Sequence, residues 1–204
     1  MIKNIIFDWS GTISDDFGVL YEICMELFEE HGVKRVSREQ FLAAYALPYM
    51  VSINTFLNIS KEEWDGKFQA LWKERGIPKI IPGAFETLEQ LKAKGYRMSV
   101  LTSHPRDFIN REIIQYFGEN KFFESIYAGI YDKKDHILIL LKEQGFNAKE
   151  TVFIGDTTHD IETGKHAGVV TVAVLSGYNH IDKLKGIEPD FIIPDVSKLP
   201  LILK

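Results

Sequence analysis

The chain has little of what marks secreted, membrane-spanning or nucleic-acid-binding proteins. Its 204 residues include one cysteine, Cys24, so no disulfide can form within the chain and a reducing compartment is expected. No apolar run approaches the ~20 residues that span a bilayer. The first apolar run ends at Asp8, which is much too early for a signal peptide. We therefore expect a cytoplasmic protein with no membrane partner.

Charge is also limited, both in amount and in clustering. The formal net charge is −5, and the densest basic cluster is "KRVSR" at 34–38. This cluster is too small to release many counterions from a nucleic acid, so we interpret it as a solvated turn and expect no nucleic-acid partner. Hydrophobic residues make up 45% of the chain and charged residues 26%, which is ordinary for a folded globular protein.

The sequence does contain a series of short apolar runs rich in Val, Ile and Phe. Near-continuous apolar strands of this kind are buried on both faces, and helical patterns such as 82–95 and 136–145 separate them. This alternation predicts an α/β fold with a doubly wound parallel sheet. The predicted strands are 4–8, 97–103, 125–129, 151–156, 169–175 and 190–194.

One long interval, between Ile13 and Ile81, breaks the alternation because it contains helical patterns and no convincing strand. These patterns cover about 17–31, 37–45, 49–57 and 60–75. The last of them places Trp64, Phe68, Leu71 and Trp72 on one face, which we interpret as its packed side. The sequence therefore predicts an α-helical cap at 14–81, inserted into a core made of 1–13 and 82–204.

Acidic side chains follow two of the predicted strands. Asp8 comes at the end of the first strand, and Asp156 and Asp160 belong to "GDTTHD" after the fourth. The reacting groups of an open α/β sheet gather at the carboxyl ends of its strands. Asp8 and Asp156 would repel each other there unless a cation neutralised them, which indicates a hard divalent ion such as Mg²⁺.

Groups suited to an anion occur at the same predicted edge. Thr102 or Ser103 would supply a hydroxyl donor, and Lys133 a fixed positive charge, for the spread charge of a phosphoryl group. Gly11 permits a sharp turn with exposed amides, a further anion-binding feature.

Taken in order, these motifs resemble those of the haloacid dehalogenase-like hydrolases, which read D-x-D-G-T, then Thr or Ser, then Lys, then G-D-x-x-x-D. This chain has "DWSGT" at 8–12, Thr102, a lysine in "DKKDHILILLKEQG" and "GDTTHD" at 155–160. The resemblance covers essentially the whole chain, and the predicted insert stands at the place of the family's helical cap. It implies a Rossmann-like core and Mg²⁺-dependent hydrolysis of a small phosphorylated metabolite.

The resemblance also implies roles for the residues that match the motifs. Asp8 would be the nucleophile that forms an aspartyl-phosphate, and Thr102 would hold a phosphate oxygen. Lys133 would orient Asp8 and balance its charge. Lys134 is the rival for that role, but the spacing from Lys133 to Gly145 matches family members better.

For the metal, the resemblance implies that Asp8, Asp156 and the backbone carbonyl of Ser10 bind Mg²⁺. Asp160 would reach the metal directly or through water, or would support Lys133. The carbonyl contact is indifferent to the side chain at position 10.

Ser10 is where the chain departs from the family pattern. The usual aspartate at this position is a general acid and base, and proton transfer of this kind contributes roughly 10²–10⁴ in rate. A serine hydroxyl can position water but cannot act as an acid near neutral pH. We therefore expect a phosphatase with a modified acid–base step.

Three family branches also lack this aspartate. Ion-pumping ATPases need membrane helices, and haloacid dehalogenases use no metal, whereas the "GDTTHD" acids favour one. Phosphonoacetaldehyde hydrolases read "DWAGT" and use a cap lysine as a Schiff base, but 41–54 contains no lysine. A C–P bond hydrolase and a catalytically weak protein that binds a phosphorylated ligand remain the alternatives.

The remaining candidates are histidines and one tryptophan. None of His104, His136, His159 and His166 has ligand-like spacing, so we expect surface or cap positions, although His104 and His159 are close enough to the motifs to touch substrate. Trp9 is expected to point away from the site and to pack near the cap hinge.

Overall fold

The computed structural model describes residues 1–203, and its central sheet confirms the predicted α/β class. Across these residues the larger sheet has six parallel strands in the order β5-β4-β1-β6-β7-β8. The strands are β1 (Asn4–Phe7), β4 (Arg97–Leu101), β5 (Ser125–Tyr127), β6 (Thr151–Gly155), β7 (Val170–Val174) and β8 (Phe191–Ile193). Each of them lies within one of the six segments predicted as strands.

Strand β1 is central, and its position brings the motif residues together. Phe7 pairs in register with Val100 of β4 on one side and with Ile154 of β6 on the other. Because the three strands are parallel and end at the same level, the residues that follow them meet at one edge of the sheet.

Helices cover both faces of this sheet. Ile5 and Phe7 belong to a buried cluster with residues of α5 and α6, whereas Ile6 packs on the opposite face with Leu140 of α7. The helices of this core are α5 (Ala84–Ala93), α6 (Arg106–Phe117), α7 (Lys133–Gln144), α8 (Thr158–Ala167), α9 (Ile181–Gly186) and α10 (Leu199–Ile202), with short 3₁₀ turns at Ala148–Glu150 and Val196–Lys198.

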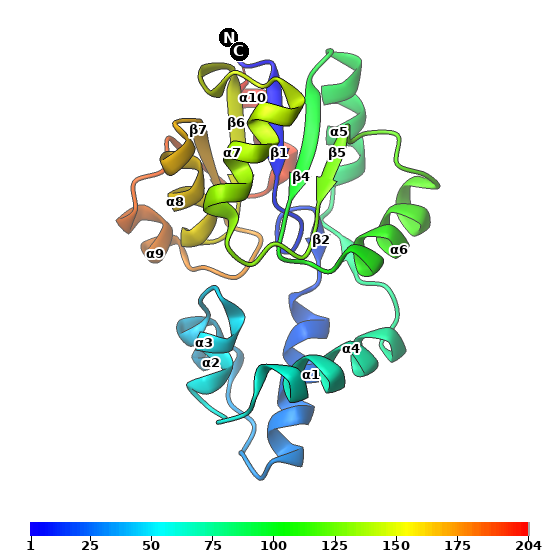
Figure 1. The fold of residues 1–204 in the computed structure, drawn as a ribbon, viewed down its shortest axis with the longest axis vertical. Coiled ribbons are helices and arrows are strands. Elements are labelled where there is room, and N and C mark those ends of the chain that lie inside the picture. The colour runs from blue at the N-terminus through cyan, green and yellow to red at the C-terminus, as the bar shows by residue number, and fades with distance from the viewer. Residues whose placement is uncertain (204) are drawn as a thin grey trace.

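A second body of helices faces the carboxyl edge of the sheet (Figure 1). Its helices are α1 (Phe17–Glu30), α2 (Arg38–Ala44), α3 (Tyr49–Asn54) and α4 (Lys61–Glu74), which agree with the four helical patterns in the sequence. They bury a core of their own, in which Trp64 and Trp72 are each 2% exposed. Within residues 1–203, no helix is long and apolar enough to cross a membrane.

The chain passes between the two bodies at a short antiparallel pair that the sequence did not predict. Strands β2 (Ser14–Asp15) and β3 (Lys79–Ile80) have two residues each, with Ser14 opposite Ile80. This pair holds the two crossing segments side by side, so both ends of the helical insert return to one place.

Two helical glycines provide a matched test of the packing. A Cβ at Gly164 of α8 would lie 2.6 Å from Thr171 Cγ2 of β7, whereas a Cβ at Gly66 of α4 would meet nothing within 4 Å. Gly164→Ala should therefore lower the free energy of unfolding by about 1–3 kcal/mol through overpacking. Gly66→Ala should raise it by about 0.5–1 kcal/mol through helix propensity. Urea denaturation measures both, and equal shifts of the same sign would contradict the packing of α8 on β7.

Candidate active site

The loop after β1 turns tightly and places Asp8 at the sheet edge. The Asp8 amide donates to the Ile154 carbonyl at 2.8 Å, and the Trp9 carbonyl accepts from the amides of Ile13 and Ser14. Gly11 has a φ of +70°, and a Cβ there would lie 2.5 Å from Asp156 Oδ2. Only glycine suits this position, because both the conformation and the contact exclude a side chain.

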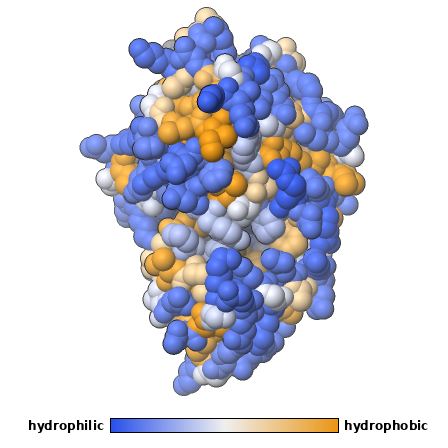
Figure 2. All heavy atoms as spheres, in the orientation of Figure 1, coloured by the Kyte–Doolittle hydropathy of each residue, from blue (hydrophilic) through white to orange (hydrophobic). Residues whose placement is uncertain are grey.

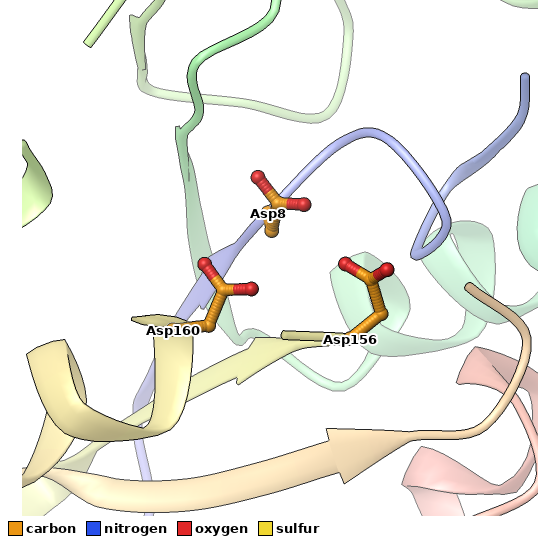
Figure 3. Close-up of side chains that lie close together, drawn as sticks. All are labelled: Asp8, Asp156 and Asp160. Carbon is orange, nitrogen blue, oxygen red and sulfur yellow. The ribbon is translucent and has the colours of Figure 1, made fainter. Parts of the chain in front are cut away.

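Three carboxylates gather at this edge, as Figure 3 shows. Asp8 follows β1, Asp156 follows β6 and Asp160 lies in the first turn of α8. One oxygen of each lies within 4.8 Å of one oxygen of the others, and the three residues are 4%, 1% and 1% exposed. The carboxylates that the sequence singled out therefore share one buried space.

Lys133 is the cation of this cluster. Its Nζ donates to Asp8 Oδ1 at 2.7 Å and to Asp160 Oδ1 at 2.6 Å. Lys134 points elsewhere and lies 3.5 Å from Glu162 Oε2 on the surface. The difference arises because α7 begins at Lys133, three residues earlier than the predicted helix, with Asp132 as its N-cap.

Burial and the neighbouring charges shift the pKa values of these groups, each in its own direction. Burial raises the pKa of Asp8 against the opposing effect of Lys133. Burial, together with the charges of Asp8 and Asp160, raises the pKa of Asp156 well above its usual value. Burial would lower the pKa of Lys133, but its two carboxylate partners outweigh that effect and raise it. One lysine does not balance three ionised carboxylates in a buried space, so Asp8 and Asp156 ionise less readily than they would in water.

The carboxylates differ in the donors that they already have. Asp160 Oδ1 accepts from Lys133, and its Oδ2 accepts from the amide and hydroxyl of Thr157 at 3.1 and 2.6 Å. Asp156 Oδ2 accepts from the Tyr178 amide at 2.6 Å, but its Oδ1 is buried with no hydrogen-bond partner among residues 1–203. An orphaned carboxylate oxygen beside Asp8 suits a hard divalent cation such as Mg²⁺.

Of the two hydroxyl residues predicted to bind phosphate, Ser103 lines the pocket and Thr102 does not. Thr102 is fully buried, and its hydroxyl oxygen accepts from the His104 amide at 3.2 Å. Ser103 is half-buried and lines the pocket together with Asp8 and Lys133. The structure therefore brings the hydroxyls and the lysine to the nucleophile's side of the sheet.

Ser10 belongs to a buried chain of polar contacts that the sequence did not reveal. Its Oγ lies 3.2 Å from His104 Nδ1, and His104 Nε2 lies 3.1 Å from Glu112 Oε1. Glu112 Oε2 accepts from Trp9 Nε1 at 2.9 Å. The expected surface or cap position of His104 is wrong, because this residue is 7% exposed and held by a carboxylate of α6.

Trp9 belongs to the main core cluster, which also contains Ile13 and Ile81 beside the crossing segments. Its ring packs edge-on against Phe117 and Phe123 in the main core. Two other histidine candidates make single hydrogen bonds among the described residues: His159 Nε2 accepts from the Lys133 amide at 3.3 Å, and His136 Nδ1 lies 3.1 Å from the Asp132 carbonyl oxygen.

Asp16, which sequence reasoning missed, completes the surroundings of Ser10. It immediately precedes α1, lines the pocket and accepts from the Tyr178 hydroxyl at 2.8 Å. Its Oδ2 lies 3.7 Å from His104 Nδ1 and accepts no hydrogen bond within the described part of the chain. Burial raises the pKa of Asp16 to about 6, against the lowering effect of His104. An aspartate before a helix is ordinarily a cap, so the sequence offered no signal for this role.

His104 is charged more readily than an ordinary histidine. Burial lowers its pKa, but the hydrogen bond to Glu112 and the charges of Glu112 and Asp16 outweigh burial and raise it. Asp16 and His104 therefore form a second group of titratable side chains beside Ser10, apart from the carboxylate cluster.

The second body closes the pocket above these residues. Its side of the wall is mainly aromatic and aliphatic, with Phe41, Trp64, Phe68 and Trp72 among its members. Three of the four residues that the sequence placed on one face of α4, Trp64, Phe68 and Trp72, thus contribute to both the helical core and the pocket wall. In Figure 2, pale and weakly polar residues lie at the waist between the two bodies.

Comparison with known proteins gives consistent matches. The family model described as haloacid dehalogenase-like hydrolase matches residues 5–174. A phosphoglycolate phosphatase of Vibrio parahaemolyticus is 28% identical, over 97% of this chain and 94% of its own. The pyrophosphatase PpaX of Oceanobacillus iheyensis is 25% identical, over 99% and 97%.

Solved structures agree on the fold. A haloacid dehalogenase-like family protein from Streptococcus pneumoniae superposes with a TM-score of 0.85 at 22% identity, covering 100% of this chain and 99% of its own. CbbY from Rhodobacter sphaeroides, solved in complex with phosphate, gives 0.78 at 20% identity, over 98% and 96%.

The raised pKa of Asp16 predicts a pH-dependent gain in stability for Asp16→Asn. A carboxyl with a raised folded-state pKa binds its proton more tightly when folded, so its contribution to stability is present at pH 4 and lost as the pH rises through about 6. The variant should therefore gain up to about 3 kcal/mol over wild type between pH 4 and pH 7. Chemical denaturation at both pH values measures this. Asp15→Asn, at the exposed neighbour, is the control, and a pH-independent difference for Asp16→Asn would contradict the assignment.

Proposed function

The chain belongs to the haloacid dehalogenase-like hydrolases, and from this premise we propose that it is a Mg²⁺-dependent phosphatase acting on a small phosphorylated metabolite through Asp8. The observation that carries the proposal is the bridge from Lys133 Nζ to Asp8 and Asp160, beside the unpartnered oxygen of Asp156. The names of the relatives, a phosphoglycolate phosphatase and a pyrophosphatase, support phosphoryl chemistry.

In the proposed reaction, a carboxylate oxygen of Asp8 attacks phosphorus while Lys133 holds the other oxygen. The new O–P bond gives an aspartyl-phosphate, and the P–O bond to the leaving group breaks with its electron pair. Water then cleaves the aspartyl-phosphate and regenerates Asp8. The hydroxyls of Thr102 and Ser103 and the amides near Gly11 are the groups proposed to hold the phosphoryl oxygens.

The proposed ligands of Mg²⁺ are Asp8, Asp156 and the Ser10 carbonyl. When bound, the ion would offset the negative charge of the carboxylates and of the phosphoryl group. Asp160 is better suited to hold Lys133, because both of its oxygens already accept hydrogen bonds. Residues 14–81 would act as the cap that excludes water from the site.

Asp16 is proposed to supply the proton that Ser10 cannot. It borders the pocket, its Oδ2 has no hydrogen-bond partner among residues 1–203, and a pKa of about 6 suits an acid and base near neutral pH. His104, held by Glu112, would position Asp16 and the Ser10 hydroxyl. The protonated carboxyl group of Asp16 would give its proton to the leaving oxygen, and the resulting carboxylate would later take a proton from the attacking water.

The C–P bond alternative has less support. It needs a neutral lysine from the cap, whereas the one lysine among the described residues lining the pocket is Lys133, which comes from α7. Lys133 bridges two carboxylates that raise its pKa, so it is a cation and a poor nucleophile. A protein that only binds a phosphorylated ligand would have no use for the nucleophile and its lysine.

Release of inorganic phosphate from 4-nitrophenyl phosphate should require Mg²⁺, Asp8 and Lys133. Asp8→Asn should abolish release because the nucleophile is lost, and Lys133→Met should do the same because Asp8 loses its partner. Lys134→Met is the matched control and should retain wild-type activity, since its side chain lies on the surface. Absence of turnover by the wild type with Mg²⁺ would refute the proposed phosphatase.

The decrease in kcat caused by loss of the proton donor should depend on the leaving group. Asp16→Asn should lower kcat for phenyl phosphate by about 10²–10⁴, and much less for 4-nitrophenyl phosphate, whose anion departs without a proton. Ser10→Asp in the Asp16→Asn background should recover part of the loss. Equal losses for both substrates would mean that Asp16 has a structural role only.

A further inference from the structure

The wall of the pocket that faces Asp8 contains few basic side chains. Among the described residues that line the pocket, Lys133 is the one lysine and there is no arginine. The Lys133 ammonium already donates hydrogen bonds to two carboxylates. The acidic residues on the side of the second body are Asp16 and Asp65. Asp65 is paired with Lys61, and Asp16 lies beside His104. That side therefore offers no unpaired lysine or arginine to the part of a substrate beyond its phosphoryl group.

Two basic residues of the neighbouring helix α4, Lys61 and Lys67, do not line the pocket and are already paired with carboxylates. Lys61 pairs with Asp65, which also accepts from the Tyr49 hydroxyl, and Lys67 Nζ lies 3.2 Å from Glu30 Oε2 on the surface. A carboxylate or second phosphate on the substrate would thus lose its hydration on binding and would find no cationic side chain among the described residues to pair with. Such a group pays a large desolvation cost.

Aromatic rings make up a large part of this wall. Phe68 lies 6.1 Å from Trp64 and 5.5 Å from Trp72, measured between ring centroids, and Tyr45 stacks on Tyr178 at 4.4 Å. Flat apolar surfaces of this kind favour another flat apolar group through burial and ring packing.

From these observations we infer that the substrate is a phosphomonoester whose leaving group is uncharged and largely apolar, with an aromatic ring as the best fit. This inference rests on the proposed phosphatase function. It separates the chain from the substrates named for its relatives: phosphoglycolate carries a carboxylate, and pyrophosphate carries a second phosphate. Each of those would need a cation that this wall does not supply among the described residues.

The test compares two esters of similar size, 4-methylphenyl phosphate and 4-carboxyphenyl phosphate, with Mg²⁺. We expect kcat/KM for the carboxylated ester to be about 100-fold lower, the size of effect expected for an unpaired charge in a desolvated pocket. Leaving-group chemistry works in the opposite direction, because the carboxylated phenol is the better leaving group. Phosphoglycolate and pyrophosphate should be turned over at least as poorly.

A cation added to the wall should reverse the preference. Gln69 lines the pocket from an exposed position on α4, so Gln69→Lys can be accommodated. It should raise kcat/KM for 4-carboxyphenyl phosphate about 10-fold relative to Gln69→Met, the neutral control of similar length.

The outcomes separate the two proposals. Equal kcat/KM values for the methylated and carboxylated esters, or faster hydrolysis of phosphoglycolate, would overturn the substrate assignment and leave the phosphatase standing. If the wild type released no phosphate from any of these compounds with Mg²⁺, the proposed function would fall and the substrate assignment with it.

Discussion

The arrangement of three buried carboxylates around one lysine is the constraint on which the rest of the site depends. Charges taken out of water are costly unless each finds a partner, and Lys133 supplies only one positive charge for Asp8, Asp156 and Asp160. The fold tolerates the imbalance because the surrounding sheet is fixed by its apolar core. Small residues make room for it: a Cβ at Gly155 would lie 2.4 Å from the Asp160 Cγ. The close approach of the carboxylates therefore depends on the rigidity of the sheet that carries them.

The sequence predicted those parts of the arrangement that depend on a short, continuous stretch of residues. The apolar runs predicted the six strands, and parallel topology then brought Asp8 and Asp156 to one edge. Spacing favoured Lys133 over Lys134, and the start of α7 gives the physical reason, because the first residue of that helix faces the sheet edge. Strands β2 and β3 were missed because two residues are too few to produce a periodic pattern.

Contacts between distant segments were not predictable. Glu112 is one acid on an amphipathic helix, and nothing in its neighbourhood indicates that it holds His104 and Trp9. Asp16 likewise looks like an ordinary helix start. In the proposed mechanism, the proton donor lies at the start of α1, where the Tyr178 hydroxyl binds it, whereas the nucleophile follows a strand of the sheet. Lys183 of α9 donates to the Ala43 carbonyl at 2.8 Å, so the two bodies are also tied at the far side of the pocket.

In the proposed function, the two bodies bind different parts of the substrate, and the charges of the site explain why. The core body recognises a phosphoryl group through charge, with one lysine, hydroxyls and carboxylates able to hold a metal. Charges interact strongly where water is excluded, so the lysine and the proposed Mg²⁺ act on the phosphoryl group next to them. A second anion on the substrate would lie near Asp16 and Asp65 and would find no unpaired lysine or arginine among the described residues of the pocket. The aromatic wall needs no such partner, since it binds by contact area alone, and specificity then comes from the shape of an uncharged group.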